Sequence, residues 1–315
     1  MLPDEMRELR LITDAVRGGF ERHGYGEVWT PALEYESVLA CADVAEAAPA
    51  YRLIDESGAA LALRSDMTVP IARLVSTRYA EAPLPLRFFY LAHCYRRVRP
   101  QRGQSRELLQ AGIELIGAEA PEGTVEALTV LCRTLDGVGL KDYRVGLGDA
   151  SLFRTLMERM EVPEHLRSGL LDALAMRDFV MLERALEQAG LSADVRDSLL
   201  EVSRSRGGLE VLEHAPGPVA DAVAGMREVG ERLPADVALR VIFDLGLVRN
   251  IGYYTGAVFE VYDPALGAPI GGGGRYDELL GRFGRPLPAV GFALGLERLH
   301  IALAGEERGT GAMLQ

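Results

Sequence analysis

The stretch 95–117, YRRVRPQRGQSRELLQAGIELIG, decides the fold, because it has the pattern of a β-hairpin that handles a polar ligand. Its second half alternates strictly, with apolar side chains at Leu109, Ala111, Ile113 and Leu115. Side chains of a strand point to opposite faces with a period of two, so Gln110 and Glu114 project together on either side of Gly112. A carboxylate and an amide beside a glycine, on an otherwise apolar strand, indicate the floor of a pocket. The alternative is a half-solvated strand whose polar residues face water, and this segment alone supports both interpretations equally.

The residues before this strand have the composition of a turn. RPQRGQ (99–104) contains proline and glycine, which are strong turn formers. The sequence therefore predicts that residues 95–99 form the partner strand and bring arginines to the same rim.

Length and composition indicate a globular protein of about two domains. The chain has 315 residues, of which 48% are hydrophobic and 25% charged, enough for a sizeable core. The N-terminal MLPDEMRELR lacks the apolar run of a signal peptide, and no stretch approaches the roughly 20 apolar residues of a membrane span. We therefore expect a cytoplasmic protein.

Charge and cysteine content exclude several kinds of site. The net charge of −12 argues against nucleic-acid binding, because a protein that binds nucleic acid needs a basic surface. Cys41, Cys94 and Cys132 are widely spaced and odd in number, so they read as free thiols in a reducing compartment. The histidines are equally scattered, so the sequence predicts no metal site and no cofactor.

Strand and helix patterns predict an α+β fold with a largely antiparallel sheet. Apolar residues at helical spacing, Leu9, Ile12, Val16 and Phe20, predict a first helix that ends near residues 23–24. A further helix is predicted over 122–135, and strand patterns stand at 25–35, 61–64, 86–97, 143–149, 239–248 and 253–262. Residues 271–274 read as a glycine-rich turn. A closing helix is expected to carry the apolar stripe Phe292, Leu296, Leu299 and Leu303.

The middle of the chain differs from its ends. From residue 150 to about 233 the sequence consists of short helical patterns with few strand-like runs. We therefore expect a core formed by 1–150 and 236–315, with 151–235 as an inserted helical subdomain. Regular βαβ alternation and a G-x-G-x-x-G after a strand are both missing from the sequence, which disfavours a dinucleotide-binding fold.

Four segments together resemble the catalytic core of a class II histidyl-tRNA synthetase over nearly the whole chain. YGEVWTPALE (25–34) resembles motif 1, which builds the dimer interface in that family, and the hairpin 95–117 resembles motif 2. LVRNIGYYTGAVFE (247–260) is similar to the histidine-specific segment. Residues 271–299 resemble motif 3, with Arg298 as its arginine. The resemblance implies a class II synthetase-like core with a mainly antiparallel sheet flanked by helices.

The resemblance also implies a histidine-binding set. Histidine presents imidazole N–H groups, an ammonium and a carboxylate, so its site needs acceptors at both ends and a cation. The matching positions are Glu114 and Tyr254 for the imidazole, with Tyr253 beside them, Asp66, Thr68 and Gln110 for the ammonium, and Arg249 for the carboxylate. Glycines at 272–274 would let the backbone approach the ligand. Read singly, these tyrosines could be core aromatics and the arginine a surface ion pair, but their joint placement disfavours that.

The departures from the family pattern fall mainly on the ATP side. Arg96 and Arg298 match and imply a remnant of an anion or nucleotide site. Val98 stands where the family has the glutamate that accepts from adenine, and a missing acceptor costs about 1–3 kcal/mol. Gln104 replaces a triphosphate-binding arginine. On the histidine side Asp66 is shorter than the usual glutamate and follows Ser65 in place of proline, and residues 250–252 replace Gly-Leu-Asp.

This pattern resembles the regulatory subunits of ATP phosphoribosyltransferase, which share the synthetase core. Only 16 residues follow Leu299, so we expect no anticodon-binding domain. The resemblance implies a non-catalytic, histidine-binding chain that partners the short catalytic subunit at the first step of histidine biosynthesis, as a homodimer within a hetero-oligomer. One alternative is a truncated enzyme that adenylates histidine or aminoacylates a non-tRNA acceptor. The other is a structural dimerisation partner with a vestigial pocket.

Overall fold

The computed structural model describes residues 2–42, 50–97, 105–215, 217–249 and 252–313. The chain begins with helix α1 (Pro3–Arg22), whose predicted apolar stripe is buried. Proline fits the first turn of a helix because the N–H that it lacks would have no partner there. Helix α1 ends at Arg22 and is followed by its C-cap His23 and by Gly24, whose φ is 80°. The prediction of this helix and of its end is confirmed.

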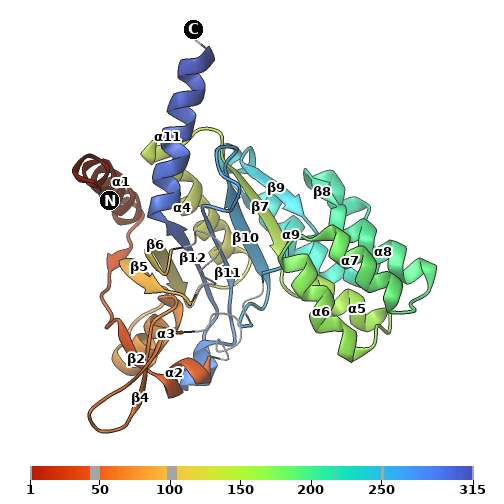
Figure 1. The fold of residues 1–315 in the computed structure, drawn as a ribbon, viewed down its shortest axis with the longest axis horizontal. Helices are drawn as coiled ribbons and strands as arrows, with labels where there is room; N and C mark the ends of the chain where they lie inside the picture. Colours follow the sequence, from red (N-terminus) through yellow and green to blue (C-terminus); the bar gives the residue numbers. More distant parts are fainter. Residues whose placement is uncertain (1, 43–49, 98–104, 216, 250–251, 314–315) are drawn as a thin grey trace.

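A nine-stranded sheet forms the centre of the molecule (Figure 1). Its strands, in spatial order, are β1 (Gly26–Glu27), β5 (Leu86–Tyr95), β6 (Glu107–Ile116), β12 (Ala289–Gly295), β11 (Gly271–Arg275), β10 (Ala257–Tyr262), β7 (Arg144–Asp149), β9 (Val241–Asp244) and β8 (Arg206–Gly207). Only the pairs β1–β5 and β7–β9 are parallel among these described strands. The predicted α+β class with a mainly antiparallel sheet is therefore confirmed.

Helices cover one face of this sheet. Helix α1 packs on α4 (Glu122–Val138) and on α11 (Leu296–Met313). All three helices contact β6, and α4 and α11 also contact β12. Beneath them lies a hydrophobic cluster that takes Ile113 and Leu115 from β6. The other face of the sheet carries a second cluster, which includes Tyr90, Tyr253, Tyr254 and Tyr276.

Two smaller parts flank the central sheet. A three-stranded sheet consists of β2 (Leu33–Tyr35), β4 (Ala60–Leu63) and β3 (Arg52–Ile54), with α2 (Glu36–Cys41) beside it. Helix α3 (Thr68–Arg78) follows β4 and contacts the short helix η4 (Leu280–Phe283). None of the helices in the described part of the chain is long and apolar enough to cross a membrane.

The segment between β7 and β9 is almost entirely helical. It contains α5 (Leu152–Arg159), α6 (Glu164–Ala175), α7 (Phe179–Gln188), α8 (Ala193–Arg204), η2 (Leu209–Glu213), η3 (Gly217–Val219), α9 (Ala220–Arg232) and α10 (Ala235–Ala238). Helices α5 to α8 gather at one end of the molecule (Figure 1). Their buried residues Leu182 and Leu199 belong to the same hydrophobic cluster as Leu147 of β7. The division into a core and an inserted subdomain stays a prediction.

Three sequence-based expectations need correction. The partner of β6 is β5, which pairs from Leu86 opposite Ile116 to Tyr95 opposite Glu107, so this arm of the hairpin starts well before the predicted 95–99. The Arg96 N–H still donates to the Arg106 carbonyl over 2.9 Å, and residues 98 and 99 lie outside the described residues. The glycines 271–274 form strand β11 between β10 and β12 and not a turn. These positions need glycine because a Cβ there would collide with the adjoining backbones. Phe292 lies in β12, one strand before the helix that its stripe was expected to join.

Candidate functional site

The site is built on the face of β6 that carries Gln110, Gly112 and Glu114. Gln110 is 6% exposed and Glu114 only 1%. The half-solvated alternative for this strand is therefore wrong, because both polar side chains are removed from water. Burying a polar group is costly unless it is hydrogen-bonded, so these two residues need partners inside the protein or on a ligand.

Glycines on β6 and on the neighbouring strand β12 make room for polar side chains. Gly291 of β12 lies opposite Glu114, and a Cβ at Gly291 would collide with the Glu114 carboxylate. A Cβ at Gly112 would collide with the Tyr90 hydroxyl. The sheet surface is therefore recessed at these two glycines, and the Glu114 carboxylate and the Tyr90 phenol occupy the space.

Glu114 is held by two hydroxyl groups. The Thr68 hydroxyl donates to its Oε1 over 2.8 Å from the start of α3, and the Tyr276 hydroxyl donates to its Oε2 from the residue after β11. Burial raises the pKa of Glu114 to about 8, although both hydrogen bonds act to lower it. The negative charge of Asp66 raises it further. Glu114 is therefore mostly protonated near pH 7 and can donate as well as accept.

Asp66 stands beside this carboxyl at the junction of β4 and α3. Its Oδ1 accepts a hydrogen bond of 3.2 Å from the backbone N–H of Val69. Burial raises the pKa of Asp66, which the Val69 N–H and the charge of Arg96 partly offset. Arg96 is tied to the same junction, because its Nε donates to the Ser65 carbonyl over 3.2 Å.

Three tyrosines close the site over the sheet. The rings of Tyr253 and Tyr254 meet edge to face at 5.1 Å, and Tyr253 meets Tyr276 in the same way at 5.7 Å. Tyr254 lies over β11, where a Cβ at Gly274 would come within 2.9 Å of its ring. Sequence reasoning missed Tyr276. It shares the face of Gly272 and Gly274 by the period of two, a signal that appears only once 271–275 is read as a strand.

Arg249 reaches the same face of the sheet from the loop that follows β9. Its Nη1 donates to the Phe259 carbonyl over 3.1 Å, and its Nε lies 3.8 Å from Glu260 Oε1. The guanidinium also lies 5.7 Å from the centre of the Tyr254 ring. A Cβ at Gly272 would overlap its Nη1, so that glycine makes the position possible. Burial alone would lower the pKa of Arg249, but Tyr254 and Glu260 raise it, so the side chain stays charged.

Gln110 has an acceptor that no described residue uses. Its Oε1 is buried and receives no hydrogen bond within the described part of the chain. A buried acceptor without a donor costs about 1–3 kcal/mol, which a ligand N–H would remove.

Two more predicted residues lie at the edge of the site. Arg298 donates from Nη1 to the Pro269 carbonyl over 2.6 Å. Burial and the charge of Arg96 lower the pKa of Arg298, which places the two guanidinium groups within electrostatic reach of each other. An anion bound near both would offset this repulsion, because an opposite charge favours the charged form of each guanidinium. Val98 and Gln104, the departures on the ATP side, lie outside the described residues, as do Asn250 and Ile251.

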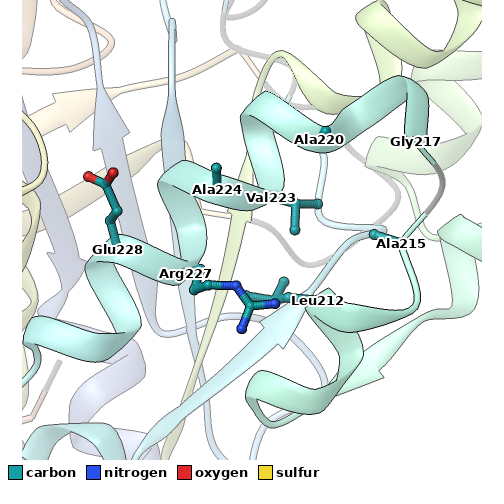
Figure 2. A pocket seen from close by; sticks show the side chains of 8 residues that line it. All are labelled: Leu212, Ala215, Gly217, Ala220, Val223, Ala224, Arg227 and Glu228. Atoms are coloured by element: carbon teal, nitrogen blue, oxygen red, sulfur yellow. The ribbon is translucent and has the colours of Figure 1, made fainter.

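The structure thus brings the predicted histidine set to one face of the sheet. We call this set, with Tyr276 added, the Glu114 cluster: Asp66, Thr68, Gln110, Glu114, Arg249, Tyr253, Tyr254 and Tyr276. A separate pocket of about 360 Å³ lies in the helical segment (Figure 2). It is lined by α9 and the residues before it, among them Leu212, Val223 and Arg227, and contains no member of the cluster.

Comparisons with known proteins identify the family of the chain. The family model described as Histidyl-tRNA synthetase matches residues 1–299. The ATP phosphoribosyltransferase regulatory subunit of Moorella thermoacetica is 42% identical over 309 residues, which cover 96% of this chain and 79% of that protein. The protein of the same name from Carboxydothermus hydrogenoformans is 37% identical, over 96% of this chain and 94% of its own length.

Solved structures give the same result. A protein described as an ATP phosphoribosyltransferase regulatory subunit/histidyl-tRNA synthetase from Bacillus halodurans C superposes with a TM-score of 0.86 at 33% identity, over 96% of this chain and 80% of that one. A histidine–tRNA ligase subunit from Alicyclobacillus acidocaldarius gives 0.84 at 32% identity, over 98% and 96%. Fold and sequence both confirm the predicted resemblance, and the chain belongs to the family of ATP phosphoribosyltransferase regulatory subunits, which has the class II histidyl-tRNA synthetase fold.

Proposed function

We propose that this chain is a non-catalytic regulatory subunit that binds histidine in the Glu114 cluster. The observation that carries the proposal is the buried carboxyl of Glu114, which Thr68 and Tyr276 hold and whose pKa burial raises to about 8. A carboxyl that both donates and accepts near neutral pH suits an imidazole, which also has one donor and one acceptor nitrogen.

Each end of histidine has a chemically suitable partner in the cluster. Glu114 and Tyr254 take the imidazole, and Arg249 takes the carboxylate through its planar guanidinium. Asp66, Thr68 and the unused Oε1 of Gln110 accept from the ammonium. Because Asp66 and Arg249 lie in the same cluster, the two charges of the amino-acid backbone would be balanced locally.

The proposed partner is the short catalytic subunit of ATP phosphoribosyltransferase, whose activity would require this chain. Histidine would inhibit by binding more tightly to one assembly state than to the other, because equal affinity for both shifts nothing. We place this complex in the cytoplasm. We also retain the division into a core of 1–150 and 236–315 and a helical insertion of 151–235.

Exposed apolar residues support a homodimer within that assembly. Trp29, in the segment that resembles motif 1, is 82% exposed. Tyr35, directly after that segment, is 55% exposed, and Ile54 of the same small sheet is 80% exposed. Apolar residues gathered on a surface mark an interaction site when they are contiguous. A second copy of the chain is the proposed occupant.

Calorimetric titration with histidine tests the proposal, first with the purified chain and then with the catalytic subunit present. We expect binding in the wild type and its loss in Glu114→Ala and Tyr254→Phe. Tyr143→Phe is the matched control, because Tyr143 is a buried, hydrogen-bonded tyrosine in the other cluster. No binding at millimolar histidine under either condition would overturn the proposed sensor.

The second candidate is an enzyme that adenylates histidine or aminoacylates a non-tRNA acceptor. The electrostatic effect of Arg96 on Arg298 favours it, because two guanidinium groups that act on one site can clamp phosphates in an adenylate-forming transition state. Histidine-dependent exchange of pyrophosphate into ATP separates the two candidates. A robust exchange rate that falls in Arg298→Gln would replace the regulatory proposal by the enzymatic one.

A further inference from the structure

A chain of polar contacts leads from the helical segment to Arg249. Arg177, at the corner between α6 and α7, donates from Nη2 to the Tyr262 hydroxyl oxygen over 2.9 Å. Tyr262 in turn donates to Glu260 Oε2, and Glu260 Oε1 lies 3.8 Å from Arg249 Nε. The direction of these bonds is determined, because a guanidinium has donors only and the tyrosine proton is therefore left for Glu260.

A second contact from Arg177 reaches the loop that carries Arg249. Arg177 Nη2 lies 2.8 Å from Asp244 Oδ2, at the end of β9. The other oxygen, Oδ1, accepts from the backbone N–H of Gly246 over 3.0 Å, and the Asp244 carbonyl accepts from Leu247 N–H over 3.1 Å. The single side chain of Arg177 thus anchors both the partner of Arg249 and the loop before it.

Glycines keep this row of contacts clear. Glu260 lies in register between Gly146 of β7 and Gly272 of β11. A Cβ at Gly146 would stand 3.4 Å from the Tyr262 ring, and one at Gly272 would overlap the Arg249 guanidinium. The glycines on both sides of Glu260 therefore leave space that the Tyr262 ring and the Arg249 guanidinium occupy.

The backbone of Arg177 also points to a role for its side chain. Its φ is 51°, the left-handed conformation in which a helix often ends and which glycine adopts most easily. Among the described residues only Glu161 shares a positive φ without being glycine. Arginine is less favourable than glycine in this backbone conformation. The guanidinium of Arg177, which glycine lacks, connects the α6–α7 corner to β9 and β10.

We propose that Arg177 and Tyr262 are positioning residues that hold Glu260 and the 244–249 loop so that Arg249 is aimed at the carboxylate of the bound amino acid. This inference rests on the proposed function, and it adds that the helical segment is mechanically linked to the carboxylate end of the site. Neither residue touches the ligand. Their effect is on where the Arg249 guanidinium stands and how firmly.

The experiment compares histidine with histidinol, in which a hydroxymethyl group replaces the carboxylate while the imidazole and the ammonium are the same. Calorimetry on the full chain measures both affinities in the wild type, Tyr262→Phe and Arg177→Gln. We expect each variant to bind histidine about tenfold more weakly, the loss of one good hydrogen bond, and to bind histidinol as the wild type does. The selectivity for histidine over histidinol would fall by the same factor. Tyr143→Phe is the control for removing a buried tyrosine hydroxyl and should leave the selectivity unchanged.

The possible failures are distinguishable. If the wild type binds no histidine, the proposed function falls and this inference falls with it. If the wild type binds and both variants keep its selectivity, or lose affinity for the two ligands equally, the proposed function stands and the positioning role is overturned. Arg177→Gln supplies the result if Tyr262→Phe does not fold, because Arg177 is partly exposed, with 29% of its side chain accessible.

Discussion

Replacing Glu114 by glutamine should change how the stability of the protein depends on pH. Burial raises the pKa of Glu114 from its ordinary value of 4.5 to about 8. Between these two pH values the folded protein binds a proton that the unfolded chain has released. The free energy of unfolding must therefore fall as the pH rises through this window, and this contribution is fully present only below about pH 4.5.

The magnitude follows from the width of the window. Each pH unit corresponds to about 1.4 kcal/mol, so the interval from 4.5 to about 8 gives an upper limit of about 5 kcal/mol. Glu114→Gln stays neutral at every pH and fills nearly the same volume. Its amide oxygen can accept from one of the two hydroxyls of Thr68 and Tyr276, and its N–H can donate to the other.

Urea denaturation followed by far-ultraviolet circular dichroism measures the effect. This signal reports on the whole backbone, whereas the one tryptophan, Trp29, is 82% exposed and a poor fluorescence probe of the core. We expect the wild type and Glu114→Gln to have similar stability near pH 4.5. Near pH 8 the variant should be more stable, by up to about 5 kcal/mol. Parallel curves for the two proteins across this range would refute the reasoning.

Two further predictions concern the residues around Glu114 and Arg249. Gly272→Ala should displace the Arg249 guanidinium and weaken histidine binding at least about tenfold in calorimetry, whereas Gly267→Ala, whose Cβ meets nothing within 4 Å, should not. Tyr276→Phe removes a hydrogen bond that lowers the pKa of Glu114 in the folded protein. The upper end of the pH window in which stability is lost should therefore move upward by about 1–2 pH units in the same urea series, while its start near pH 4.5 stays in place. A downward movement would contradict this.

Local patterns were enough to predict the elements with strong periodicity. The stripe from Leu9 to Phe20 predicted α1, and the alternation of β6 predicted which residues share the face of Glu114. Most of the arm opposite β6 was missed because the turn signals of 99–104 suggested a strand close to them. The actual partner, 86–95, was recognised as a strand but not as the other arm of the hairpin.

The parts that sequence reasoning missed depend on contacts between distant segments. Glycine has a low strand propensity, so 271–274 read as a turn, and the central place of β11 in the sheet overrides that preference. Because this strand was not predicted, Tyr276, which follows it, was not recognised as part of the site. The contacts of Arg177 with Asp244 and Tyr262 span 67 and 85 residues, so no local pattern could have pointed to them.

The glycines explain how one sheet face can hold so many polar groups. The Glu114 carboxylate lies over Gly291, the Tyr254 ring over Gly274 and the Arg249 guanidinium over Gly272. In a close-packed interior a side chain can occupy only space that its neighbours leave free, so the glycines determine where each polar group stands. Two of them, Gly272 and Gly274, belong to the same short strand, β11. A shift of β11 would therefore move the carboxylate-binding and imidazole-binding ends of the site together, which ties the geometry of the whole proposed ligand site to the register of one strand.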